Sequence, residues 1–486
     1  MSAQKNDLIV MKFGGSCLQD PPSFKQTTHN IEKYINNAKI IVVCSAVKGV
    51  TDRLINFYNR SCIEGNDGTD CQDILNGLQE RHEQVINQII KSDKEEHENA
   101  HQFLQKNIEE LTQLGRVIGL IRPSLEIQDI IVSYGEKLST YIVSQYLQSI
   151  GYGSEFISTE KIIKTDDNFG NALPLLDETE ELVIEHVKPL LENSNGKGVI
   201  CVTGYYGSTK QKQITTLGRG GTDLTAAIMA YCLRDYFNSK VIYWKDVEGF
   251  LDADPRISKT TSLLKTISYV EAKELAFFGS KVLHPLCLDV NEKGNIPSEI
   301  RPFEEPESED FTTITKDIVT DDKVIKAITS IERLSMVTIS SGTMISLPGT
   351  VSKLFSLLGD NNVNIKFISQ SSSENNITFG IDLKDSSKVS RLLGLSKFFG
   401  KQWFSIKIDN DISLLAVIGA GMLHTPGIAG KIFTTLGNNN VNVRAIAQGS
   451  SELNITIIIA RKDCKKAVNV LYSSFIENGL KKGKIK

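Results

Sequence analysis

Residues 8–16 read "LIVMKFGGS", a short apolar run with two glycines behind it, which is typical of a buried strand that ends in a tight turn. A second run of the same kind, "KIIVVCSA" at 39–46, follows a stretch with helical periodicity. Further runs occur at 198–203 ("GVICVT") and 240–244 ("KVIYW"). Strands that alternate with helices predict an α/β fold with a mostly parallel sheet between layers of helices.

Glycine-bearing segments follow each of these strands. They read "KFGGS" (12–16), "CSAVKG" (44–49), "TGYYG" (203–207) and "WKDVEG" (244–249). Because ligands of such sheets bind beyond the carboxyl ends of the strands, we expect the functional site at this edge.

The stretch "TTLGRGGTDLTAAIMA" (215–230) combines three closely spaced glycines with the start of an apolar helix. The glycines allow a tight turn, and Thr222 or Asp223 is the expected N-cap of a helix that begins near Leu224. A helix start with its free N–H groups favours an anion, and Arg219 adds a planar fork for a carboxylate or phosphate. Taken alone, these residues are better explained as a glycine-rich connection with a salt-bridged arginine, so other stretches have to decide.

The composition excludes several classes of protein. At 486 residues the chain exceeds one hydrophobic core, so about two to four domains are expected. It is 40% hydrophobic and 23% charged, with a formal net charge of −4. It has no basic block to neutralise nucleic-acid phosphates and no apolar run of about 20 residues to span a membrane. We therefore expect neither a nucleic acid nor a membrane as partner.

The eight cysteines are scattered without a CxxC pair, and the first strand begins almost directly after the N-terminus. The scattered thiols argue against zinc and against a disulfide framework. The early strand leaves no room for a signal or transit peptide. Both observations predict a cytoplasmic protein.

Two segments separate the strand-rich parts of the chain. Residues 72–118 are charged and strongly helical and predict a polar-faced helical insertion, on which His82, His97 and His101 are expected to be solvated. The acidic stretch "FEEPESEDFTT" (303–313) predicts a boundary or an exposed loop.

An internal repeat follows this boundary. Residues 348–378 and 426–456 are identical at 18 of 31 positions, at a constant offset of 78 and without a gap. Each copy has a strand, a Pro-Gly helix start, a helix and two further strands. Two copies of a small α+β unit favour a paired ligand-binding module over a solenoid, which needs three or more repeats.

Lys12 stands two residues before Gly14, which Gly15 and Ser16 follow. The glycines let backbone N–H groups approach phosphate oxygens, and the lysine supplies a positive charge beside them. The spacing is not that of a Walker loop or of a dinucleotide fingerprint.

Further candidates for nucleotide binding lie beyond the fourth strand. The loop "WKDVEGFLDADPRI" (244–257) offers Asp246 to ribose hydroxyls and Arg256 to phosphate. "AFFGSKVLHP" offers a second lysine, Lys281, in a glycine-led turn. Dispersed Lys and Arg residues suit phosphoryl transfer, which needs positioning and charge neutralisation more than acid–base chemistry.

Taken together, these stretches resemble the aspartokinases, members of the amino-acid kinase family, in one order along nearly the whole chain. The segments that carry the resemblance are "KFGGSC", "CSAVKGVTD", "YGEKLS", "VTGYYGSTKQKQITTLGRGGTD", "WKDVEGFLDADPRI" and "EAKELAFFGSKVLHP". The repeat resembles the two ACT modules through which aspartokinases sense amino acids. "FISQSSSENNITF" and "AIAQGSSELNIT" are similar to the aspartokinase half of bifunctional aspartokinase–homoserine dehydrogenases. A dehydrogenase domain is not expected in this chain.

The resemblance implies a role for each residue at a matching position. The catalytic residues would be Lys12 and Asp223. Aspartate would be bound by Thr51, Glu136, Arg219 and Thr222. ATP would be bound by Lys12, Gly14, Gly15, Ser16, Ser45, Lys245, Asp246, Arg256 and Lys281. An allosteric effector would contact Gln370, Gln448, Asn364 and Asn442. No residue is expected to bind a metal directly, since Mg²⁺ would be held mainly by the phosphates of ATP.

The resemblance also implies an architecture and partners. We expect an amino-acid kinase domain over 1–310 with a helical insertion at about 60–120, followed by ferredoxin-like α+β ACT domains over 320–400 and 401–486, the second either sequential or nested within the first. The expected reaction is ATP-dependent phosphorylation of L-aspartate to 4-phospho-L-aspartate, the first step toward lysine, threonine and methionine. The expected inhibitor is threonine or lysine, and Gln370 and Gln448 favour threonine. ACT modules usually pair, which predicts a homodimer or tetramer.

The chain departs from the family pattern at several positions. Cys17 stands where serine is usual, Tyr205 where phenylalanine is usual, and Leu251 where several members place a tyrosine near adenine. The segment "RPFEEPESEDFTT" (301–313) replaces the usual stretch before the regulatory modules. Two other functions stay open: a kinase of the same fold acting on glutamate or acetylglutamate, and a non-catalytic amino-acid sensor.

Overall fold

The computed structural model describes residues 5–63, 69–91, 93–119, 122–193, 198–258, 260–278, 282–317, 323–342, 349–370, 375–400, 403–449 and 452–477. The chain forms two compact units. The first comprises Met1–Phe250, Lys265–Tyr269 and Lys281–Asp317, and the second comprises Leu251–Leu264, Val270–Ser280 and Ile318–Lys486.

An eight-stranded sheet forms the centre of the first unit, with the strand order β3-β4-β2-β1-β7-β9-β10-β8. The strands are β1 (Asp7–Phe13), β2 (Lys39–Cys44), β3 (Gly153–Ile157), β4 (Gly198–Thr203), β7 (Asn238–Lys245), β8 (Thr266–Ser268), β9 (Ser298–Pro302) and β10 (Thr312–Thr315). Every neighbouring pair is parallel except β9 and β10. This confirms the mostly parallel α/β sheet.

The four strands predicted from apolar runs are neighbours in the order β4-β2-β1-β7, and their carboxyl ends are in register. Phe13 at the end of β1 pairs with Cys44 of β2 and Trp244 of β7, and Cys44 pairs with Thr203 of β4. The runs are continuous rather than alternating because both faces of these strands are buried. The loops after these strands therefore start at one edge.

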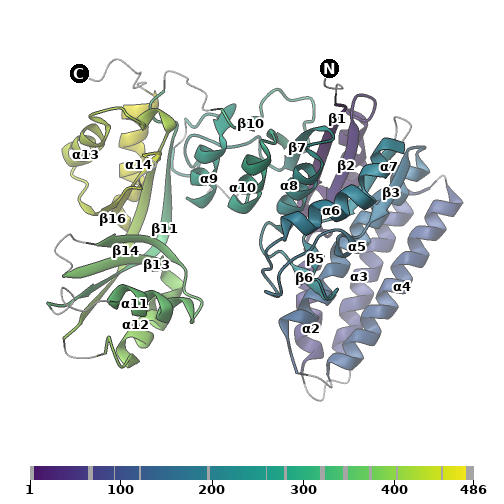
Figure 1. Ribbon diagram of the computed structural model, residues 1–486, viewed down its shortest axis with the longest axis horizontal. Helices are drawn as coiled ribbons and strands as arrows, with labels where there is room; N and C mark the ends of the chain where they lie inside the picture. Colours follow the sequence, from purple (N-terminus) through teal and green to yellow (C-terminus); the bar gives the residue numbers. More distant parts are fainter. Residues whose placement is uncertain are drawn as a thin grey trace. The chain divides into compact units, whose positions relative to one another are not determined.

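The helices of this unit pack against the sheet and against one another (Figure 1). They are α1 (Pro21–Glu32), α2 (Val50–Ser61), α3 (Thr69–Ile89), α4 (Lys94–Ile118), α5 (Leu125–Ser149), α6 (Leu176–His186), α7 (Lys188–Asn193), α8 (Gly221–Leu233) and α10 (Pro285–Gly294). Every residue of α8 is buried, and from Ala226 to Leu233 its sequence is apolar, as a helix buried on all sides requires. Short 3₁₀ turns, η1 (Gly15–Leu18) and η2 (Thr159–Lys161), and a hairpin of β5 (Tyr206–Ser208) and β6 (Ile214–Thr216) complete this unit.

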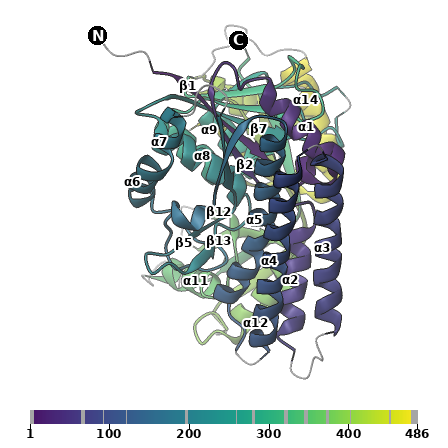
Figure 2. The ribbon, with the colours of Figure 1, turned by 90° about the vertical axis from the view of Figure 1, so that its right-hand side faces the viewer.

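Helices α2 to α5 run side by side, as both ribbon views show (Figure 2). Their apolar faces share one core with the sheet. His82 is fully buried here, and its Nδ1 lies 2.7 Å from the carbonyl oxygen of Leu78. Burial lowers the pKa of His82 to about 4. The expectation of a solvated His82 is wrong, because this histidine lies on the face of α3 that packs into the core.

The second unit contains a six-stranded antiparallel sheet in the order β12-β13-β11-β14-β16-β15. Its strands are β11 (Ala327–Ser340), β12 (Ile365–Gln370), β13 (Asn376–Asp382), β14 (Ser405–Ile418), β15 (Val443–Ala447) and β16 (Asn454–Ala460). Its helices are α9 (Tyr269–Phe277), whose first residue belongs to the first unit, α11 (Thr350–Gly359), α12 (Ser386–Leu395), α13 (Ile428–Asn438) and α14 (Cys464–Tyr472). The two copies of the repeat thus have the same order of elements, strand-helix-strand-strand-helix.

Each copy has its own hydrophobic core, one with α11 and α12 and one with α13 and α14. The long strands β11 and β14 join them. Residues 334–340 of β11 pair with β13, whereas residues 327–331 pair with 414–418 of β14, which also pairs with β16. The first part of β11 therefore lies in the half of the sheet that belongs to the second copy, although it precedes the first copy in sequence.

None of the helices in the described ranges combines the length and the apolar character that a membrane crossing requires.

Candidate functional site

A cleft of about 550 Å³ opens at the carboxyl ends of β1, β2 and β4, as expected. It draws on the loops after these strands, on α5 and on the start of α8. Its lining residues are Lys12, Gly15, Ser16, Ser45, Ala46, Val47, Lys48, Gly49, Thr51, Glu136, Gly170, Tyr205, Gly218, Arg219, Gly220, Gly221, Thr222 and Asp223. All four residues predicted to bind aspartate and both predicted catalytic residues line this one cleft.

A buried carboxylate between two lysines lies at the floor of the cleft. Asp223 Oδ1 is 2.8 Å from Lys12 Nζ, and both carboxylate oxygens of Asp223 accept from Lys245 Nζ at 3.1 and 3.0 Å. Burial alone would raise the pKa of Asp223, but the two ammonium groups lower it below its ordinary value. Burial opposes the charge of Lys12 as well, yet Asp223 raises the pKa of that lysine. Both members of the Lys12–Asp223 pair are therefore charged at neutral pH.

Lys245 is the second lysine that contacts the Asp223 carboxylate. Burial lowers its pKa, and the nearby positive charge of Lys12 acts in the same direction, while Asp223 opposes both. One carboxylate thus stabilises two cations, which leaves this end of the cleft with a net positive charge. Such a charge suits a phosphate group.

Glu136 is the second buried acid of the cleft. Its Oε1 accepts from the N–H of Ala46 at 3.1 Å, and its Oε2 is buried without a hydrogen-bond partner in the described ranges. Burial raises the pKa of Glu136 to about 8, against the smaller lowering by the Ala46 bond. A buried carboxyl oxygen that lacks a donor is costly to the fold, so this oxygen is available to a cationic or hydrogen-bonding ligand.

The turn before α8 shapes one wall of the cleft. Gly218 and Gly220 have φ of 68° and 76°, in the left-handed region that favours glycine. A Cβ at Gly220 would lie 2.5 Å from the Cβ of His284, and a Cβ at Gly218 would lie 2.2 Å from Asn171 Oδ1. The glycines at 218 and 220 are therefore needed both for their conformation and for their missing side chains.

The helix that follows begins earlier than expected. Its N-cap is Gly220, and its first residue is Gly221, so the assignment of Thr222 or Asp223 as N-cap is wrong. The reason is that both side chains have other partners: Thr222 Oγ1 accepts from Ser45 Oγ at 2.8 Å, and Asp223 binds Lys12 and Lys245. Arg219 is exposed at the mouth of the cleft, with no partner seen among the described residues.

Several predicted ATP ligands do not line this cleft. A Cβ at Gly14 would lie 3.0 Å from Lys12 Nζ, so Gly14 lies directly behind the lining. Asp246 is exposed after β7. Arg256 belongs to the second unit, where its Nη2 lies 2.6 Å from Asp254 Oδ2. Lys281 lies outside the described residues.

The cleft also contains residues that were not predicted to bind a ligand. Lys48 lies in the segment "CSAVKG", and its position just after the end of a strand could have identified it as a candidate. Its Nζ donates to Gln19 Oε1 at 3.2 Å. Tyr205 has a φ of 77°, rare for a side chain of its size, and packs against Gly221. Gly170 lies in a loop that is distant in sequence, and its N–H donates to Asp129 Oδ2 at 2.8 Å. No local sequence pattern identifies Gly170 as a residue of the cleft.

The predicted effector residues occupy matching places in the second unit. Gln370 ends β12, Gln448 follows β15, and Asn364 and Asn442 directly precede these strands. All four are exposed, and β12 and β15 are the edge strands of the sheet. Some Cα atoms of β12 and β15 nevertheless lie within 8 Å of one another.

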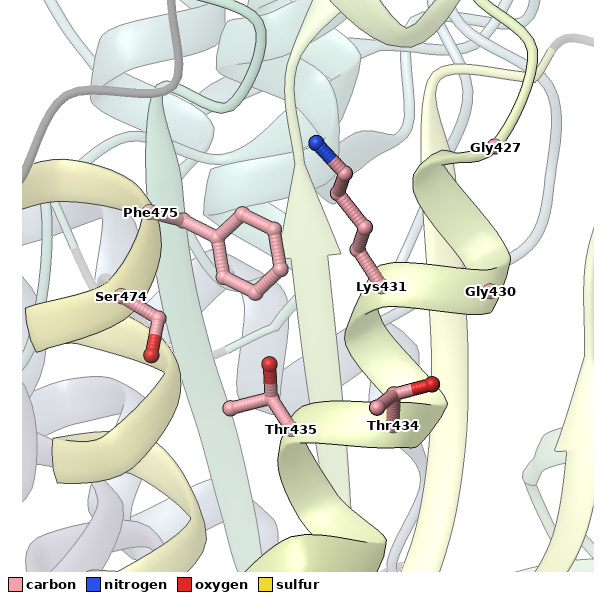
Figure 3. A pocket seen from close by; sticks show the side chains of 7 residues that line it. All are labelled: Gly427, Gly430, Lys431, Thr434, Thr435, Ser474 and Phe475. Atoms are coloured by element: carbon pink, nitrogen blue, oxygen red, sulfur yellow. The ribbon is translucent and has the colours of Figure 1, made fainter. Parts of the chain in front are cut away.

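A second cavity, of about 360 Å³, lies elsewhere in this unit, between α13 and the π-helical turn Ser473–Glu477. Lys431 and Thr435 face Ser474 and Phe475 across it (Figure 3). None of the predicted effector residues lines this cavity.

Comparisons with known proteins agree with this architecture. Residues 7–302 match the model of the amino acid kinase family, and residues 337–394 and 415–475 match an ACT domain. The chain is 31% identical over 478 residues to the chloroplastic bifunctional aspartokinase/homoserine dehydrogenase 1 of Arabidopsis thaliana, which covers 96% of this chain and 51% of that protein. The chain thus spans about half the length of the bifunctional relatives it matches.

Solved structures share the fold over nearly the whole chain. The aspartate kinase of Clostridium acetobutylicum superposes with a TM-score of 0.76 at 27% identity, covering 97% of this chain and 100% of that one. Aspartokinase III of E. coli, solved with aspartate and ADP and also with lysine and aspartate, superposes with a TM-score of 0.78 at 24% identity, covering 96% of this chain and 99% of that one. With the parallel sheet, the buried Lys12–Asp223 pair and the match over 7–302, this chain belongs to the amino acid kinase family.

Proposed function

We propose that this chain is an aspartate kinase that transfers the γ-phosphoryl group of ATP to the side-chain carboxylate of L-aspartate. The products are 4-phospho-L-aspartate and ADP. The observation that carries the proposal is that one cleft is lined by Lys12 and by Asp223, which Lys245 also contacts, and by Glu136, which has a buried carboxyl oxygen without a donor in the described ranges. The names of the relatives and of the solved structures support the same substrate.

Aspartate would be held by groups of opposite charge. Glu136 would pair with the ammonium group, which supplies the donor that its Oε2 lacks. Arg219 would hold a carboxylate through its planar fork, and the hydroxyls of Thr51 and Thr222 would complete the pocket. An acetylated amino group carries no positive charge, so the buried acid favours a free amino acid over acetylglutamate.

Phosphoryl transfer would take place beside the Lys12–Asp223 pair. Lys12 would neutralise charge on the transferring group, and Gly14, Gly15 and Ser16 would approach the phosphates with their backbone N–H groups. The free N–H groups at the start of α8 would add to this anion site. The attacking carboxylate has a pKa near 4 in water and is already ionised, so no general base is needed.

Asp223 would act as a positioning residue that keeps Lys12 and Lys245 charged and in place. Both of its oxygens are taken by lysines, and no group of three or more His, Cys, Asp or Glu in the described ranges could hold a metal. This donor set fits a Mg²⁺ ion that is held by the phosphates of ATP and by water. The ion would supply further neutralisation of phosphate charge.

The remaining assignments are part of the same proposal. Ser45 and Asp246 would contribute to ATP binding, with Arg256 and Lys281 reaching the nucleotide from the segments that follow β7. The catalytic domain would extend over 1–310 and the ACT domains over 320–400 and 401–486. Binding of an amino acid, threonine in preference to lysine, at the ends of β12 and β15 would regulate the kinase. A homodimer or tetramer formed through the ACT domains, in the cytoplasm, would be the working form.

The test is an ADP-release assay with aspartate, glutamate and acetylglutamate as alternative acceptors. We expect turnover with aspartate to exceed that with acetylglutamate by at least about 100-fold, because the acetyl group removes the charge partner of the buried acid, and to exceed that with glutamate by about 10–100-fold, the usual effect of one extra methylene group. Trapping the acyl phosphate with hydroxylamine identifies the product. Equal or greater turnover with glutamate or acetylglutamate contradicts the substrate, and no turnover with any acceptor favours the sensor.

A further inference from the structure

Two histidines on the helical insertion converge on one oxygen atom, away from the cleft. His97 and His101 stand one turn apart on α4, and Asn87 lies on the neighbouring helix α3. The Nε2 atom of His97 is 2.9 Å from Asn87 Oδ1, and the Nε2 atom of His101 is 3.1 Å from the same atom. The two ring centroids are 4.6 Å apart.

This geometry places the same nitrogen of both rings around a common point. Imidazole is the commonest protein ligand of transition metals, and a pair at i and i+4 on one helix face can bind a single ion. These distances are hydrogen-bond distances to the amide oxygen, so an ion bound among the three groups would replace the direct contacts, with each Nε2 about 2.0–2.1 Å from the ion. Asn87 is exposed and the two histidines are half-buried, so the side chains have room for the rotations this requires. We propose that His97, His101 and Asn87 form a binding site for a divalent transition-metal ion such as Ni²⁺, Zn²⁺ or Cu²⁺.

The surroundings favour a cation. Glu83 and Glu98 act on the ring of His101 with their negative charges. Glu83 stands one turn before Asn87 on α3, and its Oε1 accepts from Gln79 Nε2 at 2.8 Å.

The donor set defines the class of site. In the part of the chain that the structure describes, no third His, Cys, Asp or Glu joins the two rings within coordinating distance. Two imidazoles, one amide oxygen and water leave exchangeable positions, which distinguishes this site from a closed structural zinc site. Affinity should follow the order Zn²⁺ and Ni²⁺ below Cu²⁺. Because Asn87 lies on α3 and the histidines on α4, the ion would join the two helices.

Titration calorimetry of the full chain with NiCl₂ at pH 7.5 tests the site. We expect one Ni²⁺ per chain, with an affinity that falls at least about tenfold in His97→Ala and in His101→Ala, because each variant removes one of two imidazoles. His29→Ala and His186→Ala are matched controls, since each removes an exposed histidine of another helix that lies near a glutamate. Both controls should bind Ni²⁺ as the parent does.

A second variant keeps the test decisive if an alanine variant misfolds. Asn87→Asp places a charged oxygen at the shared point and should tighten Ni²⁺ binding by about tenfold. Saturating Ni²⁺ should also raise the melting temperature of the parent chain and leave that of the double histidine variant unchanged. No binding by the parent, or equal binding by the double histidine variant, overturns the site. None of these outcomes depends on kinase activity, so they test the metal site independently of the proposed reaction.

Discussion

Asp223 shows how one residue can serve two cations. Its carboxylate lies between Lys12 and Lys245 in a buried position, and the ion pair survives burial because each charge has a partner within 3.1 Å. Removing Lys12 leaves Asp223 paired with Lys245, so the fold should tolerate the change.

The proposed role of Lys12 leads to a test by substitution. Lys12→Ala should lower kcat by about 10²–10³-fold, the usual effect of removing one charge-stabilising group from a transition state, while ATP still binds. Steady-state kinetics and nucleotide titration separate the two effects. Lys25→Ala, an exposed lysine of α1, is the control and should be silent. Near-normal turnover of Lys12→Ala would contradict the role given to it.

Glu136 should cost the fold stability at neutral pH. Its folded pKa of about 8 lies above the ordinary value of 4.5, so the folded state binds more protons than the unfolded state between these values, and stability falls as pH rises through this window. Glu136→Gln removes the buried charge and keeps an acceptor for the Ala46 N–H. The variant should match the parent near pH 4.5 and be more stable by about 2–4 kcal/mol at pH 8. Urea unfolding at both pH values measures this, and a variant that is less stable at pH 8 would refute the raised pKa.

The same residue predicts the pH dependence of aspartate use. Glu136 must be ionised to hold an ammonium group, so kcat/KM for aspartate should rise by about tenfold per pH unit below pH 8 and level off above it. Glu136→Gln should lower kcat/KM throughout and flatten the profile. A parent profile that is already flat between pH 6 and 7.5 would show that Glu136 is ionised in the free protein or does not contact the substrate.

At the scale of elements, the turn before α8 is the most constrained feature of the cleft. Gly220→Ala would put a side chain on a residue with a left-handed φ of 76° and bring its Cβ to 2.5 Å from the Cβ of His284. The substitution should therefore destabilise the chain by about 1–3 kcal/mol and raise KM for aspartate. Gly430→Ala is the matched control. It lies within α13, where an added Cβ would meet no atom within 4 Å, and should stabilise by about 0.5–1 kcal/mol. Equal effects of the two substitutions on stability would contradict this account.

The elements also show what the sequence could and could not predict. Continuous apolar runs predicted β1, β2, β4 and β7, because strands buried on both faces need such runs. The predicted N-cap of α8 was wrong, because the side chains of Thr222 and Asp223 contact residues that are distant in sequence instead of capping the helix. The burial of His82 was also missed, since a charged helix gives little local sign of which face enters a core. Gly170 reached the cleft through a contact with Asp129 across 41 residues of chain, which no local pattern encodes.

At the scale of the whole molecule, the chain passes between its two compact units repeatedly, at 250/251, 264/265, 269/270, 280/281 and 317/318. The segments 251–264 and 270–280 thus belong to the unit that contains the repeat, although they interrupt the sequence of the unit that contains the cleft. They are held there by buried polar contacts. Asp252 Oδ1 accepts from Tyr472 Oη at 3.0 Å, and Glu271 pairs with Lys326 at 3.4 Å and accepts from the Ala420 N–H at 3.0 Å.

This connectivity offers the proposed regulation a route along the chain. Residues 251–264 lie between β7 and β8 in sequence and residues 270–280 follow β8, so a change in the repeat would act on segments that are continuous with both strands. We expect threonine to bind with measurable heat and to lower kinase activity. Gln370→Ala and Gln448→Ala should each weaken threonine binding by about tenfold, because each variant loses one or two hydrogen bonds to a charged ligand. Asn361→Ala is the control, since its amide donates to the carbonyl of Leu357 within its own module. Calorimetric titration with threonine and with lysine decides between the effectors. Heat from lysine alone would reverse the choice of effector, and binding that neither glutamine variant weakens would move the effector site away from β12 and β15.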